Sequence, residues 1–148
     1  MIELSNEKDT EKLAAWLAAL LPAGSLLLLR GPLGAGKTTL IRYLARALGF
    51  TGRVTSPTYT LMHTYPTPHG DLLHVDVYRL PDISAIFDLG LEEARENAYL
   101  TAVEWGNPAD FPEGLELIIE PTGENSRRIQ LVAHTDELQD LLVKLTRI

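Results

Sequence analysis

Eight residues in the first third of the chain restrict the fold more than any others. Residues 31–38 read GPLGAGKT and match the pattern G-x-x-x-x-G-K-[ST] at every fixed position. An unbroken apolar run precedes them at residues 25–30, and leucines spaced four apart follow within residues 37–48. The run is typical of a strand covered on both faces, and the spacing is typical of a helix with one apolar side. The segment is therefore predicted to be a strand, a phosphate-binding loop and a helix.

The loop has the residue types that bind the phosphates of a nucleotide. Glycines let the backbone curl so that successive N–H groups face phosphate oxygens, and the start of a helix adds a positive dipole. Lys37 is expected to hold the β- and γ-phosphates of ATP or ADP, and Thr38 to offer its hydroxyl to Mg²⁺. The residues expected to contact the nucleotide here are Gly34, Ala35, Gly36, Lys37, Thr38 and Thr39.

A second strand must bring a carboxylate to the metal, and two acids are suitably placed. Glu104 follows the apolar residues 100–103, and Asp76 lies near the end of a strand predicted over residues 72–78. Ligands of open α/β sheets bind at the carboxyl ends of strands, so both acids are expected beside the loop. Glu104 is the first choice for the metal, and Asp76 is expected to position water or metal. The alternative is that Asp76 forms a surface ion pair with Arg79.

Trp105 directly follows Glu104 and is a large aromatic residue at the expected edge of the site. It is suited to stacking on adenine or to gating the site, and packing within the sheet explains it equally well. The four histidines have no metal-ligand spacing, and all four are interpreted as structural or solvated. The chain contains no cysteine, which excludes zinc ribbons, iron–sulfur clusters and thiol nucleophiles.

The charge pattern points to a small anionic ligand. The net charge is −7, which argues against an extensive nucleic-acid surface. No acid occurs between Glu11 and Asp71, an interval that contains Arg30, Lys37, Arg42, Arg46 and Arg53. The sequence has neither the D-x-x-G nor the N-K-x-D motif of guanine-specific proteins, and its later arginines are too scattered to form a kinase lid. No arginine is obviously placed as a catalytic finger, so hydrolysis by the isolated protein is expected to be slow.

Helical and strand-like segments alternate along the chain and predict one α/β domain over residues 1–148. We expect a mixed, mostly parallel sheet with flanking helices and a C-terminal antiparallel hairpin. A first helix should begin between Ser5 and Asp9, both of which are suitable N-cap residues, and residues 66–70 should form a turn. Residues 81–97 are predicted as helical turns broken at Gly90.

The remaining expectations concern the C-terminal region and the location of the protein. The hairpin should pair residues 115–120 with residues 127–134, and Asp136 should cap a last helix. Residues 13–29 carry no charge, yet they are too short to cross a bilayer and are broken at residues 22–25. Acidic residues near the start do not fit a signal peptide, so a cytoplasmic location without membrane contact is expected.

Five motifs resemble, in order and spacing, those of the bacterial TsaE family, formerly called YjeE. They are residues 31–40 (GPLGAGKTTL), 56–61 (SPTYTL), 74–80 (HVDVYRL), 89–92 (LGLE) and 103–105 (VEW). The resemblance covers nearly the whole chain and implies a P-loop NTPase fold. The family pattern usually has Asp in place of Pro32 and often Pro in place of Gly106, and neither departure removes a chemical group assigned above to catalysis.

The resemblance also implies an activity and partners. It implies a weak, Mg²⁺-dependent ATPase that serves the threonylcarbamoyladenosine modification of tRNA, with Lys37, Glu104 and Asp76 as catalytic residues. Family members work with TsaB and TsaD and do not transfer the threonylcarbamoyl group themselves, so tRNA is involved only indirectly. Residues 56–61 resemble a loop that senses the γ-phosphate. Thr10 and Arg127 resemble contacts on the adenine side.

Two other functional classes remain open from the residues alone. The chain is also consistent with a small-molecule kinase that uses Asp76 as the base toward a hydroxyl substrate. A third hypothesis, after the kinase, is an adaptor that binds nucleotide without hydrolysing it and engages a partner only when loaded. Transfer of phosphate to a metabolite rather than to water would identify the kinase, and partner binding without turnover would identify the adaptor.

Overall fold

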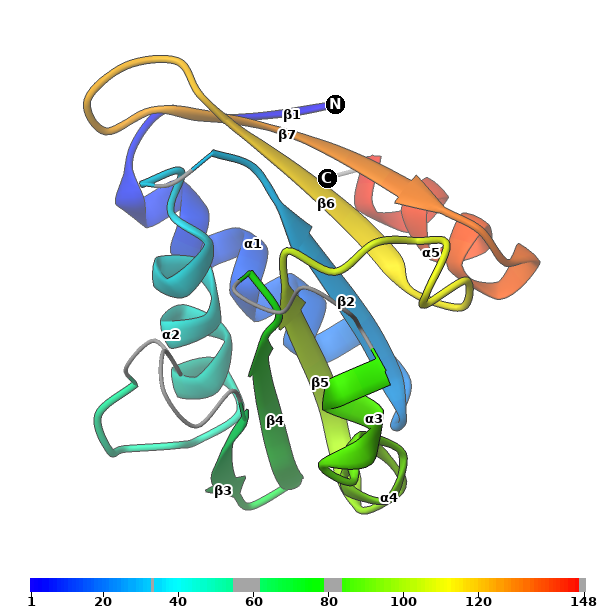
Figure 1. The fold of residues 1–148 in the computed structure, drawn as a ribbon. Coiled ribbons are helices and arrows are strands. Elements are labelled where there is room, and N and C mark those ends of the chain that lie inside the picture. The colour runs from blue at the N-terminus through cyan, green and yellow to red at the C-terminus, as the bar shows by residue number, and fades with distance from the viewer. Residues whose placement is uncertain (33, 55–61, 79–83, 147–148) are drawn as a thin grey trace.

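Seven strands form one sheet in the order β1-β7-β6-β2-β5-β4-β3 in the computed structural model of the chain (Figure 1). The structure describes residues 1–32, 34–54, 62–78 and 84–146. The strands are β1 (Ile2–Leu4), β2 (Ser25–Arg30), β3 (Met62–Thr67), β4 (Gly70–Asp76), β5 (Ala98–Glu104), β6 (Leu115–Pro121) and β7 (Arg127–Ala133). The helices are α1 (Glu7–Leu20), α2 (Lys37–Ala47), α3 (Ser84–Asp88), α4 (Leu91–Glu96) and α5 (Asp136–Thr146).

Parallel pairing is confined to the centre of the sheet. The pairs β6–β2, β2–β5 and β5–β4 are parallel, whereas the pairs β1–β7, β7–β6 and β4–β3 are antiparallel. The expected mixed α/β sheet with a C-terminal antiparallel hairpin is therefore confirmed. Because β2, β4 and β5 are parallel, their carboxyl ends meet at one edge, where ligands of such sheets bind.

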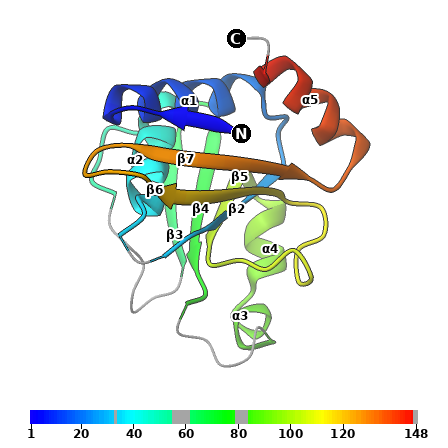
Figure 2. The same cartoon turned by 90° about the horizontal axis from the view of Figure 1, so that it is seen from above.

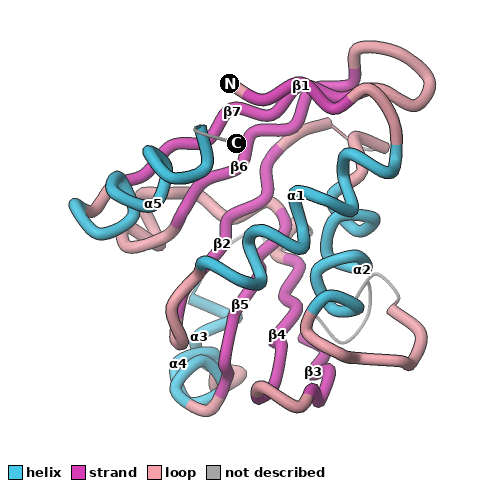
Figure 3. Tube along the Cα trace, turned by 180° about the vertical axis from the view of Figure 1, so that it is seen from behind, coloured by secondary structure: helices cyan, strands magenta, loops and turns pink. Residues whose placement is uncertain are grey.

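Helices cover both faces of the sheet (Figure 2). Helices α1, α2 and α5 lie on one face, and α3 and α4 lie on the other; α1 crosses in front of the sheet when seen from behind (Figure 3). The leucines of β2 alternate between the two faces: Leu27 and Leu29 join the cluster under α1 and α2, while Leu26 and Leu28 join the opposite cluster. The unbroken leucine run follows from this burial on both sides.

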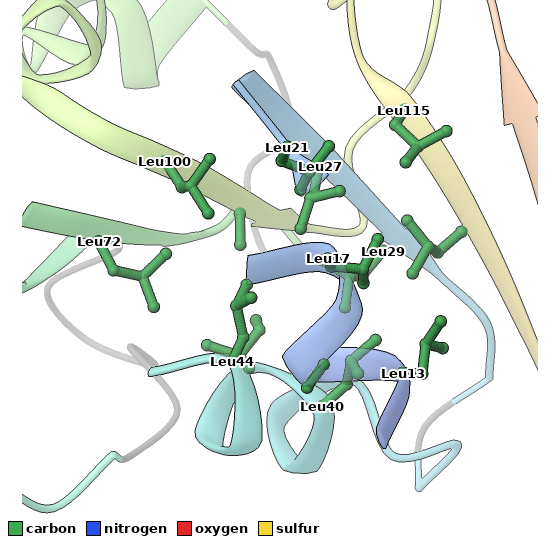
Figure 4. Packing of buried hydrophobic residues seen from close by; sticks show 14 of the residues in the cluster. Leu13, Leu17, Leu21, Leu27, Leu29, Leu40, Leu44, Leu72, Leu100 and Leu115 are labelled. Atoms are coloured by element: carbon green, nitrogen blue, oxygen red, sulfur yellow. The ribbon is translucent and has the colours of Figure 1, made fainter. Parts of the chain in front are cut away.

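The larger core cluster fixes α2, and with it the loop that precedes α2. Leu13 and Leu17 of α1 and Leu40 and Leu44 of α2 belong to one cluster, between these two helices and the central strands (Figure 4). Each of these side chains is buried. Truncating such a leucine to alanine costs about 2–5 kcal/mol of stability, so this packing holds α2 firmly against the sheet.

Several elements differ from the sequence-based expectations. The short strand β1 was not predicted, because three residues give no readable periodicity; β1 is stabilised by pairing with β7. Pro66 lies within β3 rather than in a turn, which is tolerated because β3 is an edge strand. Asn6, not Ser5 or Asp9, caps α1 by accepting a hydrogen bond from the backbone N–H of Asp9 at 3.1 Å.

The cap of the last helix lies one residue before the predicted cap, Asp136. The hydroxyl of Thr135 accepts a hydrogen bond from the backbone N–H of Leu138 at 3.3 Å, so Thr135 caps α5 and Asp136 is its first residue. The predicted break at Gly90 is confirmed, because Gly90 has φ 89° and separates α3 from α4. Within the described part of the chain, every helix is too short or too polar to cross a membrane.

Candidate nucleotide site

The glycines at both ends of the phosphate loop are required by its backbone. Gly36 directly precedes α2 and has φ 103°. Residues with a Cβ rarely adopt this backbone conformation. Gly31 has φ 150°, and a Cβ added there would collide with the backbone carbonyl of Ile119 on β6. The loop therefore curls tightly from β2 into α2 while it lies against β6.

Lys37 points into this loop. Its Nζ donates hydrogen bonds to the backbone carbonyls of Gly31 at 2.7 Å and Pro32 at 3.0 Å. The same Nζ lies 4.0 Å from the centre of the Trp105 ring, within the range of a cation–π contact. Burial lowers the pKa of Lys37, and the carboxylates of Glu104 and Asp76 act in the opposite direction. The ammonium group is thus held where the loop, the two acids and the indole ring converge.

Thr38 and Glu104 are brought together although they lie on different elements. The Thr38 Oγ1 lies 3.1 Å from Glu104 Oε1 and 3.2 Å from Oε2, and the hydroxyl donates its proton to the carboxylate. Glu104 ends β5 and is only 4% exposed. A hydroxyl oxygen and a carboxylate are the oxygen ligands, or the partners of bound water, that Mg²⁺ prefers. The chemistry of this pair fits the predicted metal.

Asp76 lies beside Glu104 at the end of the neighbouring strand. The two residues are paired in the parallel register of β4 and β5. One oxygen of Asp76 accepts a hydrogen bond from the backbone N–H of Tyr78 at 2.9 Å. Burial raises the pKa of Asp76, the nearby charge of Glu104 raises it further, and the bond from Tyr78 opposes the rise. The alternative ion pair with Arg79 falls outside the described residues.

The structure also brings His74 into the site, and the sequence interpretation missed it. His74 is fully buried in β4, and its Nε2 lies 2.6 Å from Glu104 Oε2. Its Nδ1 lies 3.1 Å from the hydroxyl of Tyr65 on the edge strand β3. His74 and Asp76 lie two residues apart and therefore on one face of the strand, which is the only sequence signal for this contact.

Thr10 and Arg127 line one pocket beside the loop. This pocket is formed mainly by α1, the loop, α2 and the β6–β7 hairpin, and its lining includes Thr10, Ala35, Gly36, Thr39, Asn125 and Arg127. Arg127 Nε donates a hydrogen bond to the carbonyl of Ala35 at 2.7 Å. Its Nη1 donates to the carbonyls of Gly123 at 3.1 Å and Ser126 at 2.8 Å within the hairpin. One donor of this guanidinium therefore holds the hairpin against the loop, and another organises the hairpin turn.

Trp105 is not among the residues that line this pocket. Its ring packs against Tyr78, with ring centroids 4.6 Å apart, and contacts Lys37. Trp105 has φ 68° and is the one non-glycine residue with a positive φ among the described residues. Its backbone N–H donates to the carbonyl of Leu29 at 2.8 Å, which holds this unfavourable conformation in place. The indole therefore lies at the Lys37 side of the loop.

Of the five motifs that carried the family resemblance, residues 56–61 lie outside the described residues, and so does the end of the motif at residues 74–80. Gly34 lies within the loop itself, with φ 79°, and the remaining predicted site residues divide into two groups. Lys37, Thr38, Asp76, Glu104 and Trp105 meet at the carboxyl ends of the parallel strands. Thr10, Thr39 and Arg127 lie in the adjoining pocket, next to Ala35 and Gly36.

Comparisons with known proteins agree with this architecture. The family model described as "Threonylcarbamoyl adenosine biosynthesis protein TsaE" matches residues 4–130. A relative from Aquifex aeolicus, named tRNA threonylcarbamoyladenosine biosynthesis protein TsaE, is 41% identical over 130 residues, covering 86% of this chain and 92% of the relative. The Bacillus subtilis protein of the same name is 37% identical over 145 residues, covering 96% and 90%.

A solved structure supports the same assignment. The crystal structure of Bacillus subtilis YdiB superposes with a TM-score of 0.80 and 31% sequence identity, covering 99% of this chain and 93% of that one. The family match spans the strand, loop and helix of the phosphate loop together with both acids at the sheet edge. The chain therefore belongs to the TsaE family of threonylcarbamoyladenosine biosynthesis proteins.

Proposed function

We propose that this chain is a slow, Mg²⁺-dependent ATPase that drives a conformational change in partner proteins during threonylcarbamoyladenosine modification of tRNA. The observation that carries the proposal is the contact between the Thr38 hydroxyl and Glu104, 3.1 Å apart, at the mouth of a phosphate loop. Thr38 lies in the first turn of the helix that receives the phosphates, and Glu104 ends the strand next to β2. This pairing joins the two halves of a metal–nucleotide site.

Each residue of the site has a separate role in this proposal. Backbone N–H groups of residues 34–36 bind the phosphate oxygens, and Lys37 places its positive charge against the β- and γ-phosphates. Thr38 and Glu104 hold Mg²⁺, directly or through water, and the ion supplies charge neutralisation at the phosphates when bound. Asp76 lies one strand from Glu104 and orients the attacking water, for which its raised pKa suits it.

We assign the adenosine end of the nucleotide to the pocket beside the loop. Thr10 and Arg127 line this pocket together with the start of α2, so it continues directly from the phosphate site. Trp105 lies at the opposite, Lys37 side, and we assign it a gating role at the γ-phosphate end rather than stacking on adenine. The two assignments are compatible because the pocket and the indole lie against different parts of the loop.

Two arginines in the part of the chain that the structure describes support slow hydrolysis by the isolated protein. Arg30 is paired with Glu116, and Arg127 donates to backbone carbonyls, so the guanidinium groups of these two residues are already engaged. A free arginine at the γ-phosphate accelerates hydrolysis in related chemistry by about 10³–10⁵. We therefore infer that partner proteins, TsaB and TsaD, complete or read the site, and that tRNA is contacted only through them.

The test measures phosphate release from radiolabelled ATP by the purified chain, alone and with TsaB and TsaD. Lys37→Ala and Glu104→Gln should each abolish release, as should chelation of Mg²⁺. Arg128→Gln is the matched control, because Arg128 is bonded to Glu3 on the surface and should leave release unchanged. A fully active Lys37→Ala protein would contradict the proposal.

The same experiment separates the two alternatives. A kinase would move label to a metabolite pool added to the reaction, whereas an ATPase moves it to water. An adaptor would capture TsaB and TsaD in an ATP-dependent pull-down while releasing no phosphate at any ratio of the proteins. Release that depends on both Lys37 and the partners supports the proposed ATPase.

A further inference from the structure

A buried chain of hydrogen bonds lies directly behind the metal-binding acid of the proposed site. Tyr65, His74 and Glu104 come from the adjacent strands β3, β4 and β5, and all three are buried. The Tyr65 hydroxyl lies 3.1 Å from His74 Nδ1, and His74 Nε2 lies 2.6 Å from Glu104 Oε2. We propose that His74, held by Tyr65, is a positioning residue that fixes the Glu104 carboxylate in the orientation that binds Mg²⁺.

The direction of the bonds follows from the chemistry of the groups. An ionised carboxylate only accepts hydrogen bonds, so His74 Nε2 must carry a proton and donate it to Glu104. With the proton on Nε2, Nδ1 is the acceptor, and the Tyr65 hydroxyl donates to it at 3.1 Å, a shorter contact than the 3.5 Å from the same hydroxyl to His63 Nδ1. The Thr38 hydroxyl donates to the same carboxylate from the side of the loop. Glu104 is therefore held by donors from two sides, one in the sheet and one in α2.

Aromatic neighbours confine the His74 ring within the core. Its centroid lies 5.9 Å from that of Tyr65, and the Tyr65 ring also contacts Phe50, with ring centroids 4.9 Å apart. His74 pairs with Ala102 in the sheet, and the small side chain of Ala102 leaves room for the imidazole on the face beneath α2. A long Glu side chain rotates freely unless both ends are held, and here a rigid ring holds the end that carries the charge.

This inference rests on the proposed metal–nucleotide site and adds a prediction of its own. Groups that hydrogen-bond to a metal-binding side chain typically change metal affinity by about 10–100-fold when removed. Loss of His74 should therefore weaken the binding of the metal in the nucleotide complex. It should leave metal-free nucleotide binding unchanged, because His74 touches neither the loop backbone nor Lys37 in the described contacts.

The first experiment compares the unaltered protein with the variant Tyr65→Phe, both without metal or nucleotide. Long-range ¹H–¹⁵N correlation spectra of the His74 ring report which nitrogen carries the proton. We expect Nε2 to be protonated, and we expect the Nδ1 signal to shift in Tyr65→Phe because that variant removes only the hydroxyl. An unprotonated Nε2 would overturn the proposal, and so would an Nδ1 signal that is the same in Tyr65→Phe.

The second experiment measures Mn²⁺ binding, by electron paramagnetic resonance, to the complex with a non-hydrolysable ATP analogue. His74→Ala should bind Mn²⁺ at least about tenfold more weakly. His74→Gln keeps an N–H donor at a similar reach and should stay within about threefold of the unaltered protein. Calorimetry in the presence of a chelator should give the same nucleotide affinity for all three proteins.

Thr101→Val is the matched control for loss of a buried polar group. Thr101 is buried on β5 but pairs with Leu73, so its side chain lies on the other face of the sheet from Glu104. The Thr101→Val variant should therefore bind Mn²⁺ as tightly as the unaltered protein does. Normal Mn²⁺ affinity in His74→Ala, or an equal loss in Thr101→Val, would overturn the positioning role. Absence of Mn²⁺–nucleotide binding in the unaltered protein would instead refute the proposed function, so the two failures are distinguishable.

Discussion

Arg127 Nε donates a hydrogen bond to the backbone carbonyl of Ala35 at 2.7 Å, across a separation of 92 residues. This bond ties the tip of the β6–β7 hairpin to the phosphate loop at the centre of the sheet. The same guanidinium donates to three carbonyls of the hairpin turn, from Gly123, Glu124 and Ser126. One side chain thus organises the turn and joins it to the loop.

Arg127→Ala should therefore weaken both the fold and the site. Loss of charged hydrogen bonds of this kind costs about 1–3 kcal/mol of unfolding free energy, which urea denaturation measures. The affinity for a non-hydrolysable ATP analogue should fall about tenfold, equivalent to about 1.4 kcal/mol, because the loop loses its brace. The neighbouring variant Arg128→Ala breaks only surface ion pairs with Glu3 and Glu120 and should change neither quantity detectably. Equal effects in the two variants would show that Arg127 has no special role.

Thr38 provides a test of metal binding that is separate from phosphate binding. Thr38→Ala removes the hydroxyl that contacts Glu104, and the Mg²⁺ concentration for half-maximal phosphate release should rise at least about tenfold. Thr38→Ser keeps the hydroxyl and should remain within about threefold of the unaltered protein. Titration of Mg²⁺ at saturating ATP measures both. A serine variant as impaired as the alanine variant would show that the hydroxyl is not the important group.

Asp76 should make the stability of the fold depend on pH in a defined direction. Its pKa is raised in the folded chain, mainly by burial, so the folded chain keeps this proton at pH values where the unfolded chain has lost it. The stabilisation is present at low pH and is lost as pH rises through the window between the ordinary value of 3.8 and the raised one. The unfolding free energy of the unaltered protein minus that of Asp76→Asn should therefore fall as pH rises, measured by urea unfolding at several pH values. A difference that stays flat or rises with pH would contradict the burial argument.

The same Asp76→Asn variant should lose activity without losing its structure. An asparagine side chain keeps an oxygen for the backbone N–H of Tyr78, so the turn after β4 should persist. Phosphate release at neutral pH should fall by at least about 100-fold if Asp76 orients or activates water. Binding of the non-hydrolysable ATP analogue should stay within about twofold, because the phosphates are held by the loop and Lys37. Unchanged phosphate release would remove Asp76 from the catalytic set.

Local sequence patterns predicted those parts of the fold that depend on local physics. The apolar run of β2 has the predicted bounds, Ser25–Arg30, because burial on both faces requires continuous hydrophobicity. Helix α2 begins at Lys37, directly after a glycine in the left-handed conformation, as the motif implies. Strand β1 and the position of Pro66 within β3 were missed, since both depend on a partner strand that no local pattern reveals.

The candidate site divides in the same way. The sequence by itself determined the loop, Lys37 and Thr38, since glycine spacing and helix polarity act over a few residues. Only the tertiary structure decided that Glu104 meets Thr38 and that His74 lies behind Glu104, because strand order and register set which side chains share a face. The sequence shows only that His74 shares a face of its strand with Asp76. The pairing of β4 with β5 decides that its partner is Glu104.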